Sequence, residues 1–162
     1  MERAYELVHF EADPSHMHMT LDASPWGVGA VLTVNGVPKE YFFDEVSSDD
    51  RRILRVTVGD AASQQVLESL TAVIALRLWW PWWSRTRASV AIRGDNMTLL
   101  SMITDLKGKS TGLNILAREA GLLLAAAHYR PLQGIHIPGV SNVVADKLSR
   151  NQGPRRGSCP RF

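Results

Sequence analysis

Three short strand-like stretches near the start of the chain, joined by two turn signals, constrain its fold most. Residues 17–22 alternate apolar and polar side chains, which predicts a strand with one buried face. A Ser-Pro-Trp-Gly turn leads into a second predicted strand over residues 28–34. Asn35-Gly36, a strong hairpin signal, then leads into a third over residues 39–46. The pattern predicts a three-stranded antiparallel meander.

Helices alternate with single strands in the remainder of the chain. A polar stretch over residues 47–59 predicts a connector with a short helix. The next segment has helical periodicity from residue 61 to about residue 80, where Pro81 is expected to end it, and its predicted buried stripe is Val66, Leu70, Val73, Ile74 and Leu78. Two further strands and three further helices are predicted over residues 89–93, 96–106, 114–127, 135–137 and 142–150. The predicted order is therefore β-β-β-α-β-α-α-β-α.

The length of the chain, 162 residues, fits one domain with a sizeable core. Residues 1–15 show no clear period, and we interpret them as a lead-in segment to a domain over residues 16–150. Residues 151–162 are rich in Gly, Pro and Arg, which predicts a disordered tail.

Composition narrows the function classes. The single cysteine, Cys159, excludes an internal disulfide and a multi-cysteine zinc site. The longest apolar region, residues 70–83, is interrupted by Thr71, Arg77 and Pro81 and is too short to span a membrane. No stretch resembles a signal peptide, so we expect an intracellular location, in the cytoplasm or nucleus, with no membrane partner. The net charge of +2 permits a nucleic-acid partner without arguing for one.

Four carboxylates stand where one metal-dependent active site would need them. Asp22 lies on the polar face near the end of the first predicted strand, and Asp95 closes the fourth. Glu68 shares a helix stripe with small residues, and Asp146 lies on the last predicted helix. Converging carboxylates repel one another unless cations intervene, and magnesium prefers such oxygen ligands. The set therefore indicates a site for divalent ions.

Four motifs in register resemble the ribonuclease H (RNase H) domain of retroelement polyproteins, especially the gypsy-type and DIRS-type groups. Residues 21–32 (LDASPWGVGAVL) resemble the first hairpin of the family, and residues 67–73 (LESLTAV) resemble its helix with the catalytic glutamate. Residues 92–96 (IRGDN) resemble the fourth strand, and residues 136–150 (HIPGVSNVVADKLSR) resemble the closing segment. The resemblance covers roughly residues 17–150, and a set of four is harder to obtain by chance than any one motif.

The resemblance implies an RNase H-like α/β fold, a five-stranded mixed sheet with three antiparallel strands and then two parallel ones, flanked by helices. It also implies endonucleolytic hydrolysis of the RNA strand of RNA–DNA hybrids with two Mg²⁺ or Mn²⁺ ions, during retroelement reverse transcription. Asp22, Glu68, Asp95 and Asp146 would be the catalytic and metal-binding acids. We expect an adjoining reverse-transcriptase domain in the parent polyprotein.

Three polar residues beside these acids are candidate substrate contacts. Ser24, Asn96 and Asn142 each lie within a few residues of a presumed catalytic aspartate. Asn96 and Asn142 are also plausible helix caps, and the two roles are compatible.

The chain departs from the cellular and retroviral relatives in one loop. Those relatives place a mobile histidine between the last strand and the final aspartate, whereas residues 138–141 form a shortened loop here. His136 precedes the loop, on the predicted strand, and is not expected to replace that histidine. Lys107 and Lys109 are the candidates for a basic protrusion, so hybrid affinity is expected to be weak.

Other interpretations stay open beside this one. The chain could be a catalytically degenerate domain that binds nucleic acid or docks to a polymerase, or another nuclease of the same superfold, which the closing motif argues against. The tryptophan cluster over residues 79–83 could stack on bases, although packing is favoured. His16 and His18 could bind a metal, but two histidines without a third ligand favour a surface strand. Phosphate contacts are a weaker possibility for five arginines: Arg51, Arg52, Arg55, Arg85 and Arg87.

Overall fold

The computed structural model describes residues 13–85, 88–127 and 132–150. Within these ranges the elements are, in chain order, β1 (Asp13–Ala23), β2 (Gly27–Val34), β3 (Val37–Glu45), α1 (Ser48–Leu54), α2 (Ala61–Leu78), α3 (Trp80–Trp83), β4 (Ala88–Gly94), α4 (Met97–Asp105), α5 (Thr111–Ala126), β5 (Leu132–His136), a 3₁₀ turn (Gly139–Ser141) and α6 (Val143–Ser149). None of the helices described is both long and apolar enough to cross a membrane.

The five strands form one mixed sheet in the order β3-β2-β1-β4-β5. β1, β2 and β3 pair antiparallel, and β4 and β5 run parallel to β1. The hairpin between β2 and β3 turns at Asn35 and Gly36, whose φ angles are 50° and 79°. Glycine and asparagine adopt such positive φ angles at least cost. The predicted mixed sheet and its meander are therefore confirmed.

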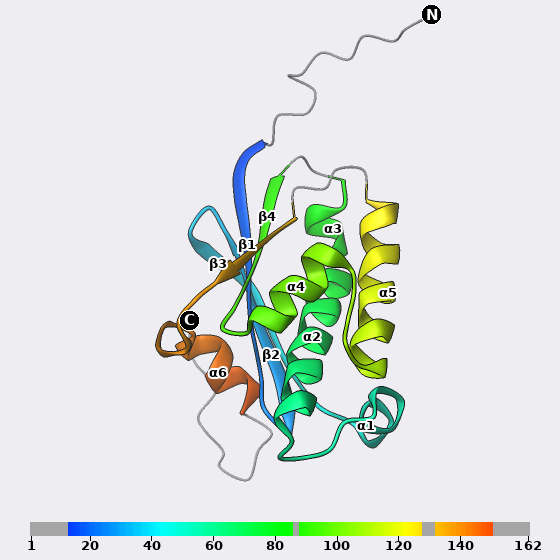
Figure 1. The fold of residues 1–162 in the computed structure, drawn as a ribbon. Helices are drawn as coiled ribbons and strands as arrows, with labels where there is room; N and C mark the ends of the chain where they lie inside the picture. Colours follow the sequence, from blue (N-terminus) through cyan, green and yellow to red (C-terminus); the bar gives the residue numbers. More distant parts are fainter. Residues whose placement is uncertain (1–12, 86–87, 128–131, 151–162) are drawn as a thin grey trace, which may run out of the picture.

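Helices cover the two faces of the sheet unequally. Figure 1 shows α2, α3, α4 and α5 on one side of the sheet and α6 alone on the other. Contacts of α2 with β1 and of α6 with β1 and β2 fix the two layers. The core lies between the sheet and α2, where Met19, Leu32 and Leu76 are fully buried.

The buried stripe predicted for the first long helix is wrong at its last residue, Leu78. Leu78 is 52% exposed, whereas Trp79 is fully buried. α2 ends at Leu78, and Trp79 turns inward against Phe42 with ring centroids 5.5 Å apart. Pro81 therefore does not end α2 but lies in the first turn of α3, a position that proline tolerates because it needs no backbone donor there.

The tryptophan cluster packs against the core. Trp79 and Trp83 are buried, and Trp83 Nε1 donates a hydrogen bond to the Leu76 carbonyl (2.8 Å). Trp80 and Trp82 are partly buried against the same core. The favoured packing interpretation is confirmed for these side chains.

The sheet begins before the predicted start of the domain. β1 begins at Asp13, three residues before the predicted boundary at residue 16. Residues 1–12 and 151–162 lie outside the described residues, so the lead-in segment and the disordered tail remain predictions.

Candidate active site

Asp22 and Asp95 lie at the carboxyl ends of two neighbouring parallel strands. Asp22 is the penultimate residue of β1, and Asp95 directly follows β4. The register pairs Thr20 with Arg93, which places the two aspartates at the same edge of the sheet. Asp22 is buried and Asp95 is exposed. Ligand sites in open α/β sheets form at this edge.

Glu68 and Asp146 approach that edge from opposite faces of the sheet. Glu68 lies on α2, 8% exposed, with the buried Thr71 and Ala72 on the same stripe. Asp146 lies in the first turn of α6 on the other face. Asp22 interacts electrostatically with both Asp95 and Asp146, and Glu68 interacts with both Asp22 and Asp95. The four predicted acids thus gather in one region from four separate elements.

Burial makes the ionised forms of two acids costly. It raises the pKa of Asp22 to about 6, against the opposing hydrogen bond from Ser149, with further increases from Asp146 and Asp95. It raises the pKa of Glu68 to about 7, with further increases from Asp95 and Asp22 and opposing hydrogen bonds from Asn96 and Gln64. Glu68 Oε2 is buried without a hydrogen-bond partner among the described residues. A cation in this region would remove these costs.

The donor set suits a hard divalent cation, but the present arrangement does not enclose one. The candidate ligands are carboxylate oxygens, which magnesium and manganese prefer, and Glu68 Oε2 has no other partner among the described residues. Nevertheless, no three acidic, histidine or cysteine side chains of the described ranges converge closely enough to hold a metal ion. Arg150 Nε lies 2.6 Å from Asp146 Oδ1 and pairs with this acid. A cation bound through Asp146 Oδ1 would compete with Arg150 for that oxygen.

Comparisons with known proteins give a fold but no sequence family. No family model matches the chain, and no curated protein matches it in sequence. RNase H1 from the halophilic archaeon Halobacterium salinarum is similar in structure, with a TM-score of 0.63, 20% identity, and coverage of 85% of this chain and 96% of that one. LC11-RNase H1, isolated from compost, gives a TM-score of 0.64 at 17% identity, covering 85% and 94% of the two chains. The chain has the RNase H fold.

A second structure of LC11-RNase H1 contains an RNA/DNA hybrid. It matches with a TM-score of 0.63 and 18% identity, and the match covers 83% of this chain and 92% of that one. The RNase H fold is thereby established for this chain. Its assignment to retroelements rests on the motifs alone and stays a prediction.

The three predicted substrate contacts, Ser24, Asn96 and Asn142, have different hydrogen-bond partners in the structure. Asn96 caps α4, where its Oδ1 accepts from Thr98 N (2.8 Å), and it also hydrogen-bonds Glu68. Asn142 is 2% exposed, and its Nδ2 donates to the Leu21 carbonyl (2.7 Å). Ser24 is also 2% exposed, with its hydroxyl in the turn between β1 and β2. Their contact with substrate stays a prediction.

One predicted helix cap is wrong. Asn142 occupies the N-cap position of α6, but its side chain makes no capping hydrogen bond. The side chain is instead directed to β1, and its Oδ1 is buried without a partner among the described residues. The predicted cap at Asn96 is confirmed.

The loop between β5 and α6 lies directly against Asp95. It forms the 3₁₀ turn Gly139–Ser141. A Cβ atom on Gly139 would lie 3.0 Å from Asp95 Oδ2, so a larger residue would crowd that carboxylate. His136 is the last residue of β5, on the strand as predicted.

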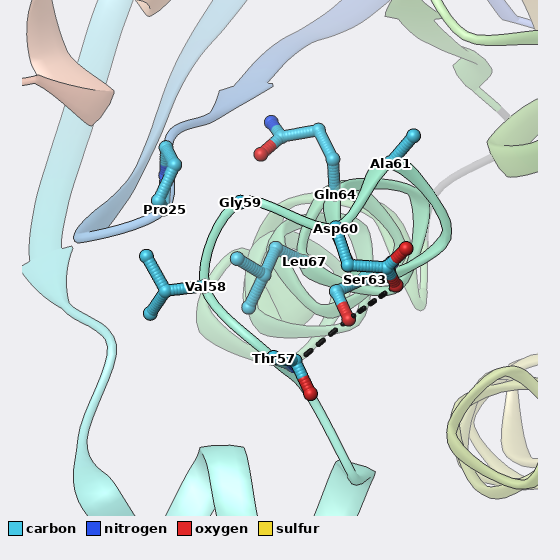
Figure 2. Close-up of a pocket in the computed structure, with 9 residues that line it drawn as sticks. All are labelled: Pro25, Thr57, Val58, Gly59, Asp60, Ala61, Ser63, Gln64 and Leu67. Carbon is cyan, nitrogen blue, oxygen red and sulfur yellow. Dashed lines mark hydrogen bonds between the residues drawn. The ribbon is translucent and has the colours of Figure 1, made fainter.

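A shallow hollow flanks the acids at the start of α2. Figure 2 shows it between the turn that follows β1 and the first turn of α2. Its volume is about 200 Å³, and its lining residues are Pro25, Thr57, Val58, Gly59, Asp60, Ala61, Ser63, Gln64 and Leu67. Asp60 caps α2 by accepting from Ser63 N and Ser63 Oγ (both 2.9 Å), so a carboxylate already occupies the helix N-terminus. Gln64 connects the hollow to the site, because it donates to the Ala23 carbonyl and hydrogen-bonds Glu68.

His16 and His18 lie on the face of β1 opposite the buried Met17 and Met19. His16 is exposed, and His18 Nε2 lies 3.2 Å from Arg93 Nη2. Burial lowers the pKa of His18, and the Arg93 charge lowers it further. A neighbouring guanidinium disfavours a metal ion at His18. The predicted surface strand is wrong, because β1 is the central strand of the sheet, although the His16 side chain on it is exposed.

The sequence analysis missed Gln64, Ser149 and Arg150. Gln64 precedes Glu68 by one helical turn, and Arg150 follows Asp146 by one turn, so i,i+4 spacing was a usable signal for both. Ser149 contacts Asp22 across 127 residues of sequence, a distance that no local pattern reveals.

Proposed function

We propose that this chain is a metal-dependent endoribonuclease that hydrolyses the RNA strand of RNA–DNA hybrids. The observation that carries the proposal is the gathering of Asp22, Glu68, Asp95 and Asp146 at one edge of an RNase H fold. The pKa values of about 6 for Asp22 and about 7 for Glu68 show that burial and mutual repulsion strain the ionised site. Strained acidic clusters of this kind are typical of sites that work with bound cations.

The four acids would hold Mg²⁺ or Mn²⁺, two ions in the proposed active form. Bound ions would supply the positive charge that activates a water and stabilises the departing 3′-oxygen of a phosphodiester. Asn96 and Gln64 are the polar neighbours that lower the pKa of Glu68, and Ser149 donates a hydrogen bond to Asp22. Asp95 is exposed and the Asp146 side chain is 42% exposed, so these two acids would face the substrate.

An RNA–DNA hybrid is the proposed partner because the LC11-RNase H1 structure contains one in the same fold. The 2′-hydroxyl of RNA is the group by which a protein distinguishes the two strands. We further propose that the chain acts beside a reverse-transcriptase domain in a retroelement polyprotein, in the cytoplasm or nucleus. Lys107 and Lys109, both exposed in the loop between α4 and α5, are its candidate phosphate contacts.

A second candidate function is a catalytically degenerate RNase H-like domain that binds nucleic acid or docks to a polymerase. The ion pair between Asp146 and Arg150 favours it, because at 2.6 Å the arginine already neutralises one acid. The lack of a three-ligand arrangement within the described ranges points the same way.

Cleavage of labelled substrates separates the two functions. The chain should cut the RNA strand of a hybrid with Mg²⁺ or Mn²⁺ and should not cut it in EDTA. Double-stranded DNA and double-stranded RNA should stay intact. Asp95→Asn should abolish cleavage and leave the circular-dichroism spectrum unchanged. Absence of hybrid cleavage under either ion, at protein excess, would overturn the enzymatic proposal and leave the binding function.

A further inference from the structure

A hydrogen bond between two serines joins the last turn of α6 to the turn between β1 and β2. Ser24 Oγ donates a hydrogen bond to the Ser149 carbonyl oxygen at 2.7 Å. The same Ser24 oxygen accepts from Gly27 N at 3.1 Å and from Trp26 N at 3.3 Å. Ser24 therefore shapes its own turn and holds the end of α6 to it.

Ser149 in turn holds a carboxylate of the candidate site. Its Oγ donates to Asp22 Oδ2 at 2.7 Å and lies 3.0 Å from the Asp146 carbonyl oxygen. A helical serine commonly bonds a carbonyl in the preceding turn. Here the shorter contact goes to a carboxylate on another element, and hydrogen bonds to ionised groups are the stronger ones. Because Ser149 is fully buried, water does not compete for its hydroxyl.

Two glycines of β2 allow this close approach. A Cβ atom on Gly27 would lie 2.6 Å from the Ser149 carbonyl oxygen. A Cβ atom on Gly29 would lie 2.5 Å from Leu148 Cβ and 2.6 Å from Ser149 N. The end of α6 thus packs directly on the backbone of β2 at these two glycines, and this packing fixes the position of Ser149 relative to β1 and β2.

We propose that Ser149 is a positioning residue that orients Asp22 for cation binding, and that Ser24 acts through Ser149. This inference rests on the proposed function, since it assigns a role toward the cation that the acids would bind. It also gives Ser24 a different role from the predicted substrate contact. Ser24 is buried and hydrogen-bonded to the backbone of α6, so it stabilises the position of Ser149 and does not face the substrate.

A double-mutant cycle in the metal-free protein tests the contact itself. Unfolding equilibria are measured in EDTA for wild type, Ser149→Ala, Asp22→Ala and the double variant. If Ser149 holds Asp22, the unfolding constant of the double variant should differ by about fivefold or more from the value obtained by multiplying the two single effects. Effects that multiply to within about twofold would overturn the contact.

Manganese affinity, measured by titration calorimetry at pH 8, tests the positioning role. Ser149→Ala should weaken binding by about tenfold, as is typical when the partner of a metal ligand is removed. Ser149→Cys, whose thiol is a weaker donor, should fall between Ser149→Ala and wild type. Ser24→Ala should also weaken binding, although Ser24 contacts no acid, whereas a residue that only touches substrate would leave it unchanged.

Ser84→Ala is the matched control. Ser84 is a buried serine at the C-cap of α3, and its loss should leave manganese affinity unchanged. Wild-type affinity in Ser149→Ala would overturn the positioning role. If wild type itself binds no manganese, the proposed function fails, and the double-mutant cycle still decides whether Ser149 holds Asp22.

Discussion

Replacing Glu68 with glutamine is expected to stabilise the metal-free protein at alkaline pH. Glu68 is buried on α2, its Oε2 has no partner among the described residues, and Asp95 and Asp22 lie near enough to repel its charge. Glutamine keeps the size of the side chain and removes the charge. The substitution therefore isolates the cost of ionising this group in the folded state.

The magnitude follows from the raised pKa. Burial and the neighbouring acids raise the pKa of Glu68 from 4.5 to about 7, so the folded state holds the proton that the unfolded state releases. The stabilisation from that proton is full below pH 4.5 and is lost as the pH rises through 7. The difference corresponds to about 3 kcal/mol. Glu68→Gln should thus match wild type near pH 4 and exceed its stability at pH 8 by about 2 to 3 kcal/mol.

Urea unfolding in EDTA between pH 4 and pH 8 measures this difference. In a separate thermal melt at pH 8, the same gain in stability should raise the melting temperature by about 4 to 10 °C. Glu45→Gln, at an exposed position at the end of β3, is the control and should show no such gain. A difference between Glu68→Gln and wild type that stays constant from pH 4 to pH 8 would refute the reasoning.

Two further predictions concern the packing and the charge of α6. Gly29→Ala should lower stability by about 1 to 3 kcal/mol in urea unfolding, because its Cβ would lie 2.5 Å from Leu148 Cβ. Gly121→Ala, in α5 with its nearest contact at 3.6 Å, should instead raise stability by up to about 1 kcal/mol, and equal effects of the two substitutions would contradict the packing. Arg150→Gln should tighten manganese binding by about threefold to tenfold in calorimetry, because it frees Asp146 and removes a nearby positive charge. Arg52→Gln, which breaks an exposed ion pair elsewhere, should leave the affinity unchanged, and a weaker affinity in Arg150→Gln would show that the arginine assists the site.

The sheet could be predicted from the sequence because its signals are local. Alternation over residues 17–22 and the Asn35-Gly36 turn each act within a few residues, and both have the predicted structure. The end of α2 could not be predicted in the same way. Helical periodicity continues through Leu78, but the core ends there, and the large Trp79 ring is buried in its place.

The four acids were predicted from motifs, and the structure gathers them in one region. Their supporting contacts were harder to predict. Asn142 was a plausible cap for α6, but its side-chain amide donates to the Leu21 carbonyl of β1 instead. The bond between Ser149 and Asp22 joins residues 127 positions apart, so it follows only from the packing of α6 on β2.

Anomalous diffraction from crystals grown with manganese tests the central claim most directly. We predict two manganese peaks about 4 Å apart, with oxygen ligands from Asp22, Glu68, Asp95 and Asp146, and with Arg150 displaced from Asp146. The peaks should be lost in Asp95→Asn. Peaks elsewhere on the molecule, or no peak near these four acids at millimolar manganese, would contradict a divalent-ion site in this chain.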